Sequence, residues 1–206
     1  MTLGLTRDIV SAVEHSDHEK ICTEARACTL CAAHLPLGPR PVFQHHPDAR
    51  ILIVGQAPGR KVHETGIAFN DASGERLRKW LGVSRETFYD ETKIALLPMG
   101  FCFPGTGKGG DLPPRPECAA TWRKPLLALL NRVELTVVLG RHALDWHLPD
   151  EAGKPLAEVV ANWKATWPRL VALPHPSPRN QAWFKRHAWF EADIIPTLQQ
   201  RVQQLL

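Results

Sequence analysis

Four short runs of apolar residues, separated by stretches of helical character, constrain the fold of this chain more than any other feature. The runs lie at residues 50–54, 93–97, 135–139 and 170–173. Each has the length of a strand and is apolar enough to be buried on both faces. Because a helix must return the chain between such strands, the alternation predicts helices on both sides of the sheet. We therefore expect an α/β fold, a three-layer α/β/α sandwich with a central, mostly parallel four-stranded sheet.

Helix signals lie between and around these runs. Ser73 is a suitable N-cap, Pro116 is suited to the first turn of a helix, and the last stretch places apolar residues such as Ile194 and Leu198 on one face. Helices are expected at 7–27 (one helix or a pair, within a helical segment of about residues 1–30), 74–81, 116–130, 141–147 and 191–206.

Composition limits the class of protein. A chain of 206 residues, 44% hydrophobic and 22% charged, is expected to form one soluble globular domain over residues 1–206. Its net charge of +4 is compatible with a polyanionic partner but does not require one. No window is long and apolar enough for a membrane span, and Arg7, Asp8 and Glu14 interrupt any signal core. We expect a cytoplasmic protein with no membrane partner.

Two loops rich in glycine and proline each follow an apolar run. Residues 55–59 read Gly-Gln-Ala-Pro-Gly, and residues 175–180 read His-Pro-Ser-Pro-Arg-Asn. Both lie past the carboxyl end of a predicted strand, where open α/β sheets bind their ligands. Glycine lets backbone approach a bound group, and the prolines beside His175 hold its imidazole with little entropy left to lose. The two loops predict a ligand pocket with a polar wall.

Four cysteines occur in two pairs. Cys28 and Cys31 form a C-x-x-C motif, and fifteen residues separate Cys102 from Cys118. In a cytoplasmic protein such a set binds metal more often than it forms disulfides. Tetrahedral zinc, a [4Fe–4S] cluster and buried thiols without a ligand all fit this spacing. The fifth cysteine, Cys22, is expected to be a small core residue of a helix.

The order of these motifs resembles the uracil-DNA glycosylase superfamily. The matching segments are G-Q-A-P-G at 55–59, G-I-A-F-N-D-A-S-G-E-R-L-R-K-W-L-G at 66–82 and H-P-S-P-R-N at 175–180. The chain is most similar to the iron-sulfur branches, families four and five, which also place one cysteine pair near the N-terminus and another after the second strand. The resemblance therefore favours a [4Fe–4S] cluster over zinc on the four cysteines.

The resemblance implies a monofunctional DNA glycosylase that hydrolyses the N-glycosidic bond of uracil and initiates base excision repair. Such an enzyme flips the nucleotide out of the duplex or acts on a single strand, so DNA is the expected partner of a monomeric protein. Phe69 would stack on the base, and His175 would donate a hydrogen bond to the departing base anion. The other expected substrate contacts are Gly55, Ala57, Pro58, Gly59, Met99, Gly100, Ser177 and Arg179.

The first motif departs from the pattern of some related families, whose third residue is an Asp or Asn that acts on the attacking water. Here that residue is Ala57, which has no polar group. As in family five, an Asp-Ala-Ser-Gly segment follows, so Asp71 is the expected catalytic carboxylate. A helix cap is the alternative role for Asp71. Gln56 and Asn70 are further catalytic candidates for holding the water.

The substrate and the DNA contacts are less sharply encoded. Families four and five read uracil with an Asn before their third cysteine, and residues 96–101 contain none. Backbone groups near Met99 and Gly100, or the Asn70 side chain, would then read the base. Uracil leads, with hypoxanthine, xanthine or another modified base as alternatives. The basic, aromatic stretch 178–187 and the Gly- and Pro-rich loop 103–117 suit DNA phosphates, although the latter is also explained as a tied surface loop.

Two other classes of protein remain possible from the sequence. The missing Asp or Asn in the first motif also fits a catalytically weak or inactive iron-sulfur protein that binds nucleic acid. A doubly wound domain that binds a small phosphorylated metabolite would share the glycine- and proline-rich turn after its first strand.

Overall fold

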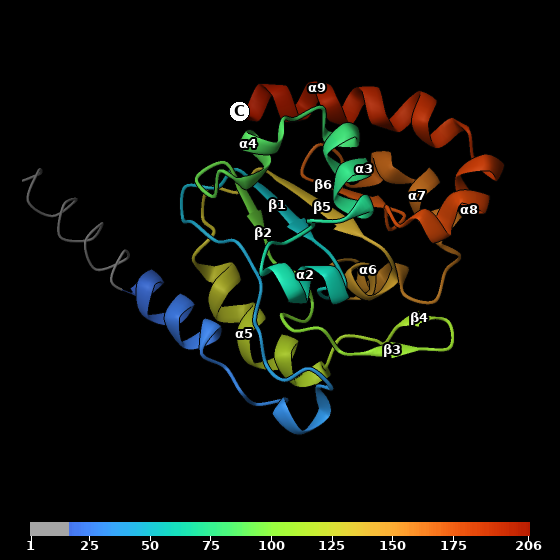
Figure 1. Ribbon diagram of the computed structural model, residues 1–206. Coiled ribbons are helices and arrows are strands. Elements are labelled where there is room, and N and C mark those ends of the chain that lie inside the picture. Colours follow the sequence, from blue (N-terminus) through green and yellow to red (C-terminus); the bar gives the residue numbers. More distant parts are fainter. Residues whose placement is uncertain (1–16) are drawn as a thin grey trace, which may run out of the picture.

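The computed structural model describes residues 17–206, and its centre is a single four-stranded sheet (Figure 1). The strands are arranged in the order β2-β1-β5-β6, and every neighbouring pair is parallel. This confirms the predicted α/β fold. The strands are β1 (Ile51–Val54), β2 (Ile94–Leu96), β5 (Leu135–Leu139) and β6 (Leu170–Leu173).

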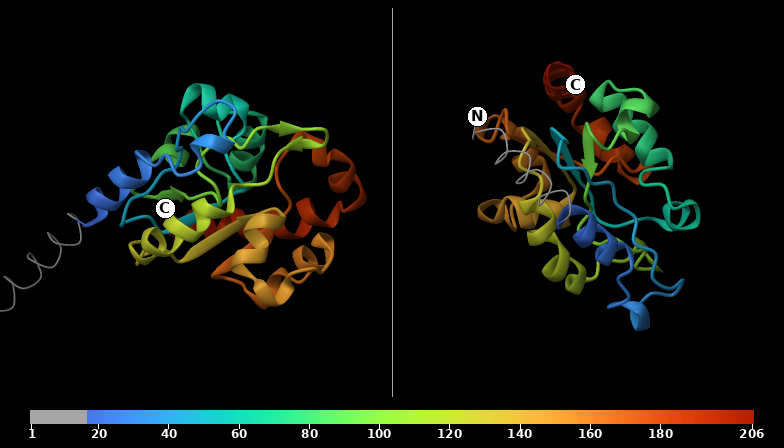
Figure 2. Two further views of the ribbon diagram at one scale, coloured as in Figure 1. Left: turned by 90° about the horizontal axis from the view of Figure 1, so that it is seen from below. Right: turned by 90° about the vertical axis from the view of Figure 1, so that its left-hand side faces the viewer.

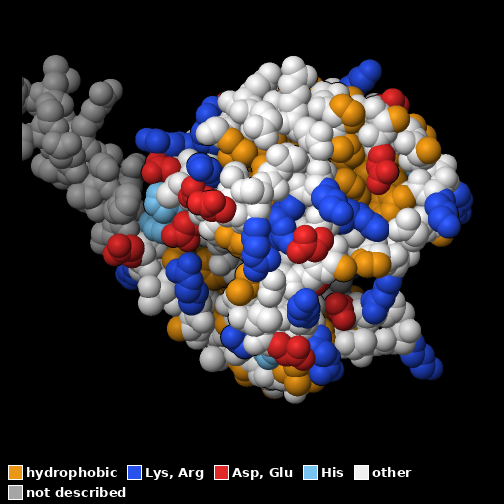
Figure 3. Space-filling view, turned by 45° about the horizontal axis from the view of Figure 1, so that its top comes forward, with side chains coloured by type: hydrophobic (Ala, Val, Ile, Leu, Met, Phe, Trp, Pro, Cys, Tyr) orange, Lys and Arg blue, Asp and Glu red, His pale blue; other side chains and the backbone are white. Residues whose placement is uncertain are grey.

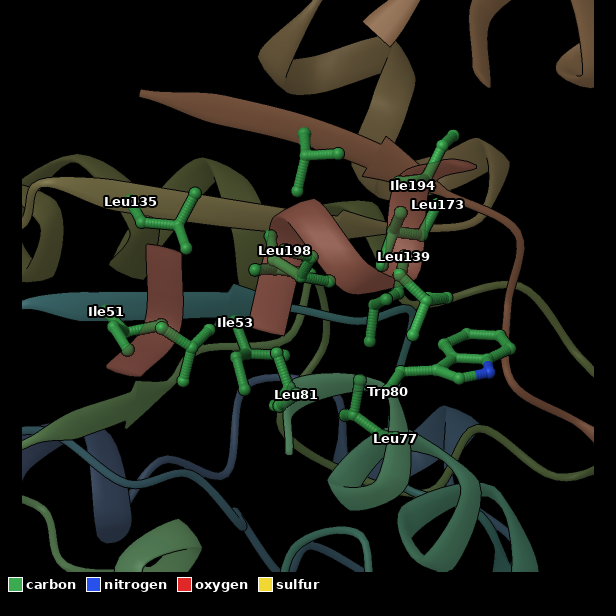
Figure 4. Packing of buried hydrophobic residues seen from close by; sticks show 14 of the residues in the cluster. Ile51, Ile53, Leu77, Trp80, Leu81, Leu135, Leu139, Leu173, Ile194 and Leu198 are labelled. Carbon is green, nitrogen blue, oxygen red and sulfur yellow. The ribbon is translucent and has the colours of Figure 1, made fainter. Parts of the chain in front are cut away.

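Alternate residues of each strand supply two separate cores, one on each face of the sheet. In β1, Ile51 and Ile53 belong to one buried cluster, whereas Leu52 and Val54 belong to the other. This is the period of two that a strand imposes on its side chains. Figure 4 shows the first cluster, in which the strand residues meet Leu77 and other side chains from the covering helices.

Helices cover both faces and complete the three layers (Figure 2). The first core is closed by α3 (Ala72–Leu81), α4 (Arg85–Tyr89), α8 (Gln181–Arg186) and α9 (Ile195–Leu205). The second is closed by the helical residues 17–26, α5 (Pro116–Ala128) and α6 (Arg141–His147), while α7 (Leu156–Ala161) contributes to both cores. The remaining helix, α2 (Arg60–Thr65), follows the first motif, and single 3-10 turns lie at Ala32–His34, Pro149–Glu151, Trp163–Ala165 and Pro178–Asn180.

The expected helices are present with altered ends. Residues 17–26 are helical, and the part of the predicted N-terminal helix before residue 17 lies outside the described residues. The N-cap of α3 is Asp71 and not Ser73. The C-terminal helix begins with a π-helical turn over Phe190–Ile194 before α9.

The loop between Cys102 and Cys118 is more regular than its composition suggests. It contains a small antiparallel hairpin of β3 (Thr106–Gly107) and β4 (Gly110–Asp111), in which Gly107 pairs with Gly110. A two-residue turn of Lys108 and Gly109 joins the strands, which is the length that hairpins prefer. The many glycines and prolines of residues 103–117 give no periodic pattern, so the sequence did not predict this hairpin.

Within the described residues, no helix has both the length and the apolar character that crossing a membrane requires.

Candidate functional site

A cleft of about 630 Å³ lies at the carboxyl ends of the strands, between the two motif loops. Its walls come from four segments: the first motif (residues 55–59), the start of α3, the β3–β4 hairpin and the second motif (residues 175–180). The predicted residues that line it are Gly55, Gln56, Ala57, Pro58, Gly59, Phe69, Asp71, His175, Ser177 and Arg179. Residues far apart in the sequence thus meet where a doubly wound sheet binds its ligands.

The first motif continues the pairing of β1 beyond the strand. The carbonyl of Gly55 accepts a hydrogen bond from the Met99 N–H at 2.9 Å, and that of Gln56 accepts one from the Gly100 N–H at 2.9 Å. Gly55 also lies against the ring of Phe69, since a Cβ at this position would be 3.2 Å from Cζ of the ring. The glycine lets the aromatic side chain pack closely over the loop.

Phe69 occupies the cleft with an unusual backbone. Its φ is +52°, a left-handed backbone angle that residues other than glycine rarely adopt. The Phe69 carbonyl lies directly against Gly74, and Nη1 of Arg78 donates a hydrogen bond to it at 3.4 Å. The ring meets Phe88 edge to face, with 6.1 Å between centroids. The half-buried ring is therefore held firmly by its neighbours.

Asp71 has two structural relationships at the same site. Its Oδ1 accepts a hydrogen bond from the Gly74 N–H at 2.9 Å, so it caps α3. The side chain also lines the cleft, where its charge acts on His175. The capping role and a role in the cleft are therefore compatible.

His175 is held as a neutral hydrogen-bond donor. Its Nδ1 accepts a hydrogen bond from the Ser177 N–H at 3.2 Å, which assigns the proton of the neutral ring to Nε2. Burial lowers the pKa of His175 below its usual value, and the charges of Asp71 and Asp111 offset only part of this effect. At neutral pH the imidazole is therefore uncharged, with an N–H to donate.

The second motif is fixed from both sides. The Asn180 side-chain amide donates to the His175 carbonyl at 2.7 Å. From α3, Nη1 of Arg76 donates to the carbonyls of Pro176 and Ser177 at 3.3 and 3.2 Å, and Nη2 donates to the Gln181 side chain at 2.9 Å. Arg76 was missed by the sequence analysis, because no motif connects it with a loop so distant in the chain.

The β3–β4 hairpin joins the two motif loops across the cleft. Nε2 of Gln56 donates a hydrogen bond to the Leu112 carbonyl at 3.2 Å. The amide that we expected to hold water therefore already uses one of its N–H groups. Two glycines let the hairpin and the motif loops approach each other closely. A Cβ added to Gly59 would lie 3.3 Å from Oδ2 of Asp111, and a Cβ added to Gly110 would lie 2.1 Å from Nη1 of Arg179. Asp111 also lines the cleft, although no motif in the sequence points to it.

Three of the predicted residues do not line the cleft. Asn70 accepts a hydrogen bond from Nη2 of Arg85 at 3.1 Å through its side-chain oxygen. Met99 and Gly100 are buried, and their N–H groups are bonded to the first motif. Pro98 contributes to the cleft instead.

The four predicted metal-binding cysteines surround one narrow cavity between residues 28–41 and the start of α5. All four are free thiols. Burial raises the pKa of Cys118 to about 12, and Cys102, Cys31 and Cys28 act in the same direction. The Phe101 N–H donates to Sγ of Cys118 at 3.3 Å. Cys22 is not part of this group and lies in the second core, as predicted.

The four sulfurs do not all lie as close together as a zinc ion would hold them. A tetrahedral zinc with bonds of about 2.3 Å needs sulfurs about 3.8 Å apart. Within the described residues, no three of these four sulfurs lie within 4.8 Å of one another. The one group of potential ligand atoms that does meet this limit contains none of the four cysteines. The donor set is chemically suited to iron and sulfide, since each thiolate of a [4Fe–4S] cluster binds a different iron atom.

The fold and cleft define a doubly wound α/β domain whose ligand site lies between two rigid loops at the carboxyl ends of its strands. The sequence model of the uracil DNA glycosylase superfamily matches residues 43–199, which is most of the chain. The chain belongs to this superfamily. Membership assigns it a uracil-DNA-glycosylase-like function in general and DNA as its partner.

Proposed function

We propose that this protein is a monofunctional uracil-DNA glycosylase that removes deaminated cytosine from DNA and so initiates base excision repair. The observation that carries the proposal is His175, which lies in the same cleft as Phe69 and keeps its proton on Nε2 because Nδ1 accepts the Ser177 N–H. A neutral donor beside an aromatic ring suits a leaving base that gains negative charge as its bond to the sugar breaks.

The reaction is a displacement at C1′ of the deoxyribose. Water attacks C1′, the bond from C1′ to the base nitrogen breaks, and its electron pair leaves with the base. The Nε2–H of His175 hydrogen-bonds to the base oxygen next to that nitrogen and stabilises the anion. Asp71 orients the water, accepts its proton and stabilises the positive charge on the sugar. Among the described residues that line the cleft there is no lysine to form a Schiff base, which supports water as the nucleophile.

The four-cysteine cavity would hold a [4Fe–4S] cluster through Cys28, Cys31, Cys102 and Cys118. When bound, the cluster supplies a rigid crosslink, since glycosidic hydrolysis transfers no electrons. Cys102 and Cys118 end the loop that carries the β3–β4 hairpin, so the crosslink would fix the hairpin over the cleft. Protein purified without oxygen should contain about four iron and four sulfide per chain. Cys118→Ser should lose both, whereas zinc in place of iron would overturn the cluster proposal.

DNA would approach the cleft through the loops around it. Arg179 lines the cleft and Lys108 at the hairpin turn is exposed, so both are placed to meet phosphates. On the face drawn in Figure 3, Lys and Arg side chains are interspersed with Asp and Glu and form no field of one sign. We therefore assign DNA contact to the residues around the cleft and not to a broad basic surface. The protein would act as a cytoplasmic monomer.

Single-turnover cleavage of uracil-containing oligonucleotides tests the proposed function. Single- and double-stranded substrates are compared with matched hypoxanthine and xanthine substrates, and strand breaks are revealed with alkali. Asp71→Asn is the informative variant, because Asn caps helices as well as Asp does. It should lose roughly 10²–10⁴-fold in rate, while the matched carboxylate variant Asp111→Asn keeps most of the activity.

The outcomes distinguish four conclusions. Uracil release that needs Asp71 supports the proposal, and loss of activity in Asp111→Asn alone would move the catalytic role to Asp111. Preferential release of hypoxanthine or xanthine would correct the substrate. Salt-sensitive binding without cleavage would establish the second candidate function, nucleic-acid binding without catalysis, which Ala57 in the cleft favours because it cannot act on water.

A further inference from the structure

A second group of potential metal ligands lies outside the cleft and outside the four-cysteine cavity. His18 and Cys22 belong to the helical residues 17–26, and their spacing of four residues places them on one face of that helix. His45 lies in the segment that precedes β1. Sγ of Cys22 is 3.4 Å from Nε2 of His18, and that nitrogen is 3.0 Å from Nδ1 of His45. All three ligand atoms lie within 4.8 Å of one another.

The orientation of His45 is fixed by the core. Its Nε2 donates a hydrogen bond to the carbonyl of Leu126 in α5 at 2.9 Å. The neutral ring therefore has its lone pair on Nδ1, the atom beside His18. A backbone carbonyl on the remote ring nitrogen is the usual support of a metal-bound histidine, because it sets both tautomer and ring orientation.

Two of the three distances between ligand atoms are close to those of a coordination tetrahedron, and the third is within 4.8 Å. Bonds of about 2.0–2.1 Å to nitrogen and 2.3 Å to sulfur require nitrogens about 3.3 Å apart and a nitrogen–sulfur distance of about 3.6 Å. The observed 3.0 and 3.4 Å differ from these by a few tenths of an ångström. A hydrogen bond explains the group less well. Within the described part of the chain, Nε2 of His18 lies near Nδ1 of His45, the His45 carbonyl at 3.3 Å and Sγ of Cys22, and one N–H cannot point well at all three.

The group is also dry and separate from the other cysteines. Cys22 and His45 each expose 1% of their surface, while His18 is half-buried and gives access from solvent. The charges that act on Cys22 belong to Arg26 and Glu91 and not to another cysteine. Two imidazoles and a thiolate form a donor set that suits zinc and related transition metals.

We propose that His18, Cys22 and His45 bind one zinc ion and leave its fourth position to a ligand outside this group. The ion joins the N-terminal helix to the segment before β1, and through His45 to α5. Its role is structural: it holds residues 17–26 over the second core, to which Cys22 and Ala25 contribute buried side chains. This site is independent of the proposed glycosylase function and of the cluster.

Metal analysis of the full-length protein tests the site. Wild-type protein purified without oxygen should contain about one zinc per chain in addition to its iron. Cys22→Ser and His18→Gln should each lose that zinc and keep the iron. The second variant guards against misfolding, because His18 is not in the core. Cys118→Ser is the matched control, and it should lose iron while the zinc that depends on Cys22 remains.

Cobalt provides a readout of the ligands themselves. Co²⁺ added to zinc-depleted wild-type protein should give a thiolate-to-cobalt charge-transfer band, and the same band should appear in Cys118→Ser but not in the double variant Cys22→Ser with Cys118→Ser. Zinc removal should lower the melting temperature of the wild type and leave that of Cys22→Ser unchanged. Equal zinc content and equal cobalt spectra with and without Cys22 would overturn the proposal and identify the group as a hydrogen-bonded cluster.

Discussion

Gly74 lies directly against the carbonyl of Phe69: a Cβ on Gly74 would come within 1.7 Å of that oxygen. No atom can be placed there, so Gly74 is the residue that allows Phe69 its left-handed backbone in the cleft. The spacing between the aromatic residue and the glycine of the Asp-Ala-Ser-Gly segment thus has a steric cause. It couples the start of α3 to the position of the ring proposed to stack on the base.

Gly74→Ala should therefore damage both stability and activity. The added methyl group must displace the Phe69 backbone, and forced overpacking of this kind costs roughly 1–3 kcal/mol or more. In a protein of this size that corresponds to a fall in melting temperature of roughly 2–4 °C for each kcal/mol. Gly109→Ala is the control, because no atom lies within 4 Å of the added Cβ. Equal melting temperatures for the two variants would contradict the steric explanation.

Asp71 should show two separable effects. Asp71→Ala removes the cap of α3 and should cost about 1 kcal/mol of unfolding free energy, whereas Asp71→Asn retains a side chain that caps helices. Both variants lose the carboxylate proposed to act on water, so both should be defective in single-turnover cleavage. Denaturation and cleavage measured on the same preparations check this. Full activity in Asp71→Asn would leave Asp71 with the capping role alone.

The sequence predicted the parts of the molecule that have local patterns. The apolar run that contains Ile51 and Leu52 is buried on both faces, so its composition alone identified a strand of a covered parallel sheet. Both alternatives for Asp71 remained open because a cap and a catalytic carboxylate use the same residue at the same place. The contacts of Arg76 and the position of Asp111 could not be predicted. Arg76 and Ser177 are 101 residues apart, and a long-range contact of this kind leaves no periodicity to read.

Arg76 is expected to be a positioning residue for the second motif. Arg76→Ala removes the donors to the carbonyls of Pro176 and Ser177, so the loop that carries His175 should lose its fixed geometry. The cleavage step should slow by about 10-fold or more, because small displacements of a catalytic group are costly. DNA affinity should change less. Arg85→Ala is the matched control, since Arg85 bonds to Asn70 outside the cleft. A larger loss of affinity than of cleavage rate would argue against positioning.

His147 should contribute to the pH dependence of stability. Nη2 of the buried Arg123 contacts Nε2 of His147 at 2.7 Å, and burial together with this cation lowers the pKa of His147 from 6.5 to about 4. Between these values the unfolded chain binds a proton that the folded protein does not, so the free energy of unfolding falls as the pH falls. One such group contributes roughly 1.4 kcal/mol per pH unit, about 3 kcal/mol across the window.

His147→Gln should reduce this slope by the contribution of about one proton, because glutamine does not titrate. Its side-chain carbonyl can still accept a hydrogen bond from Arg123. Urea denaturation from pH 7 to pH 4 measures the slope. His34→Gln, in an exposed position, is the control and should keep the slope of the wild type. An unchanged slope in His147→Gln would show that His147 takes up its proton in the folded protein as readily as in the unfolded chain.

Arg179 should contribute to DNA affinity through charge. Its guanidinium lies over Gly110, where the second motif meets the β3–β4 hairpin at the edge of the cleft. If it contacts a phosphate, Arg179→Ala should weaken binding of single- and double-stranded oligonucleotides alike and reduce the slope of log affinity against log salt by about one. Arg132→Ala is the matched control, because Arg132 precedes β5, at the end of the sheet opposite the cleft, and pairs with Asp48. Fluorescence anisotropy titrations over a range of salt concentrations measure both slopes. An Arg179→Ala variant that keeps the wild-type slope but binds double strands more weakly than single strands would instead place this side chain in the gap left by the flipped base.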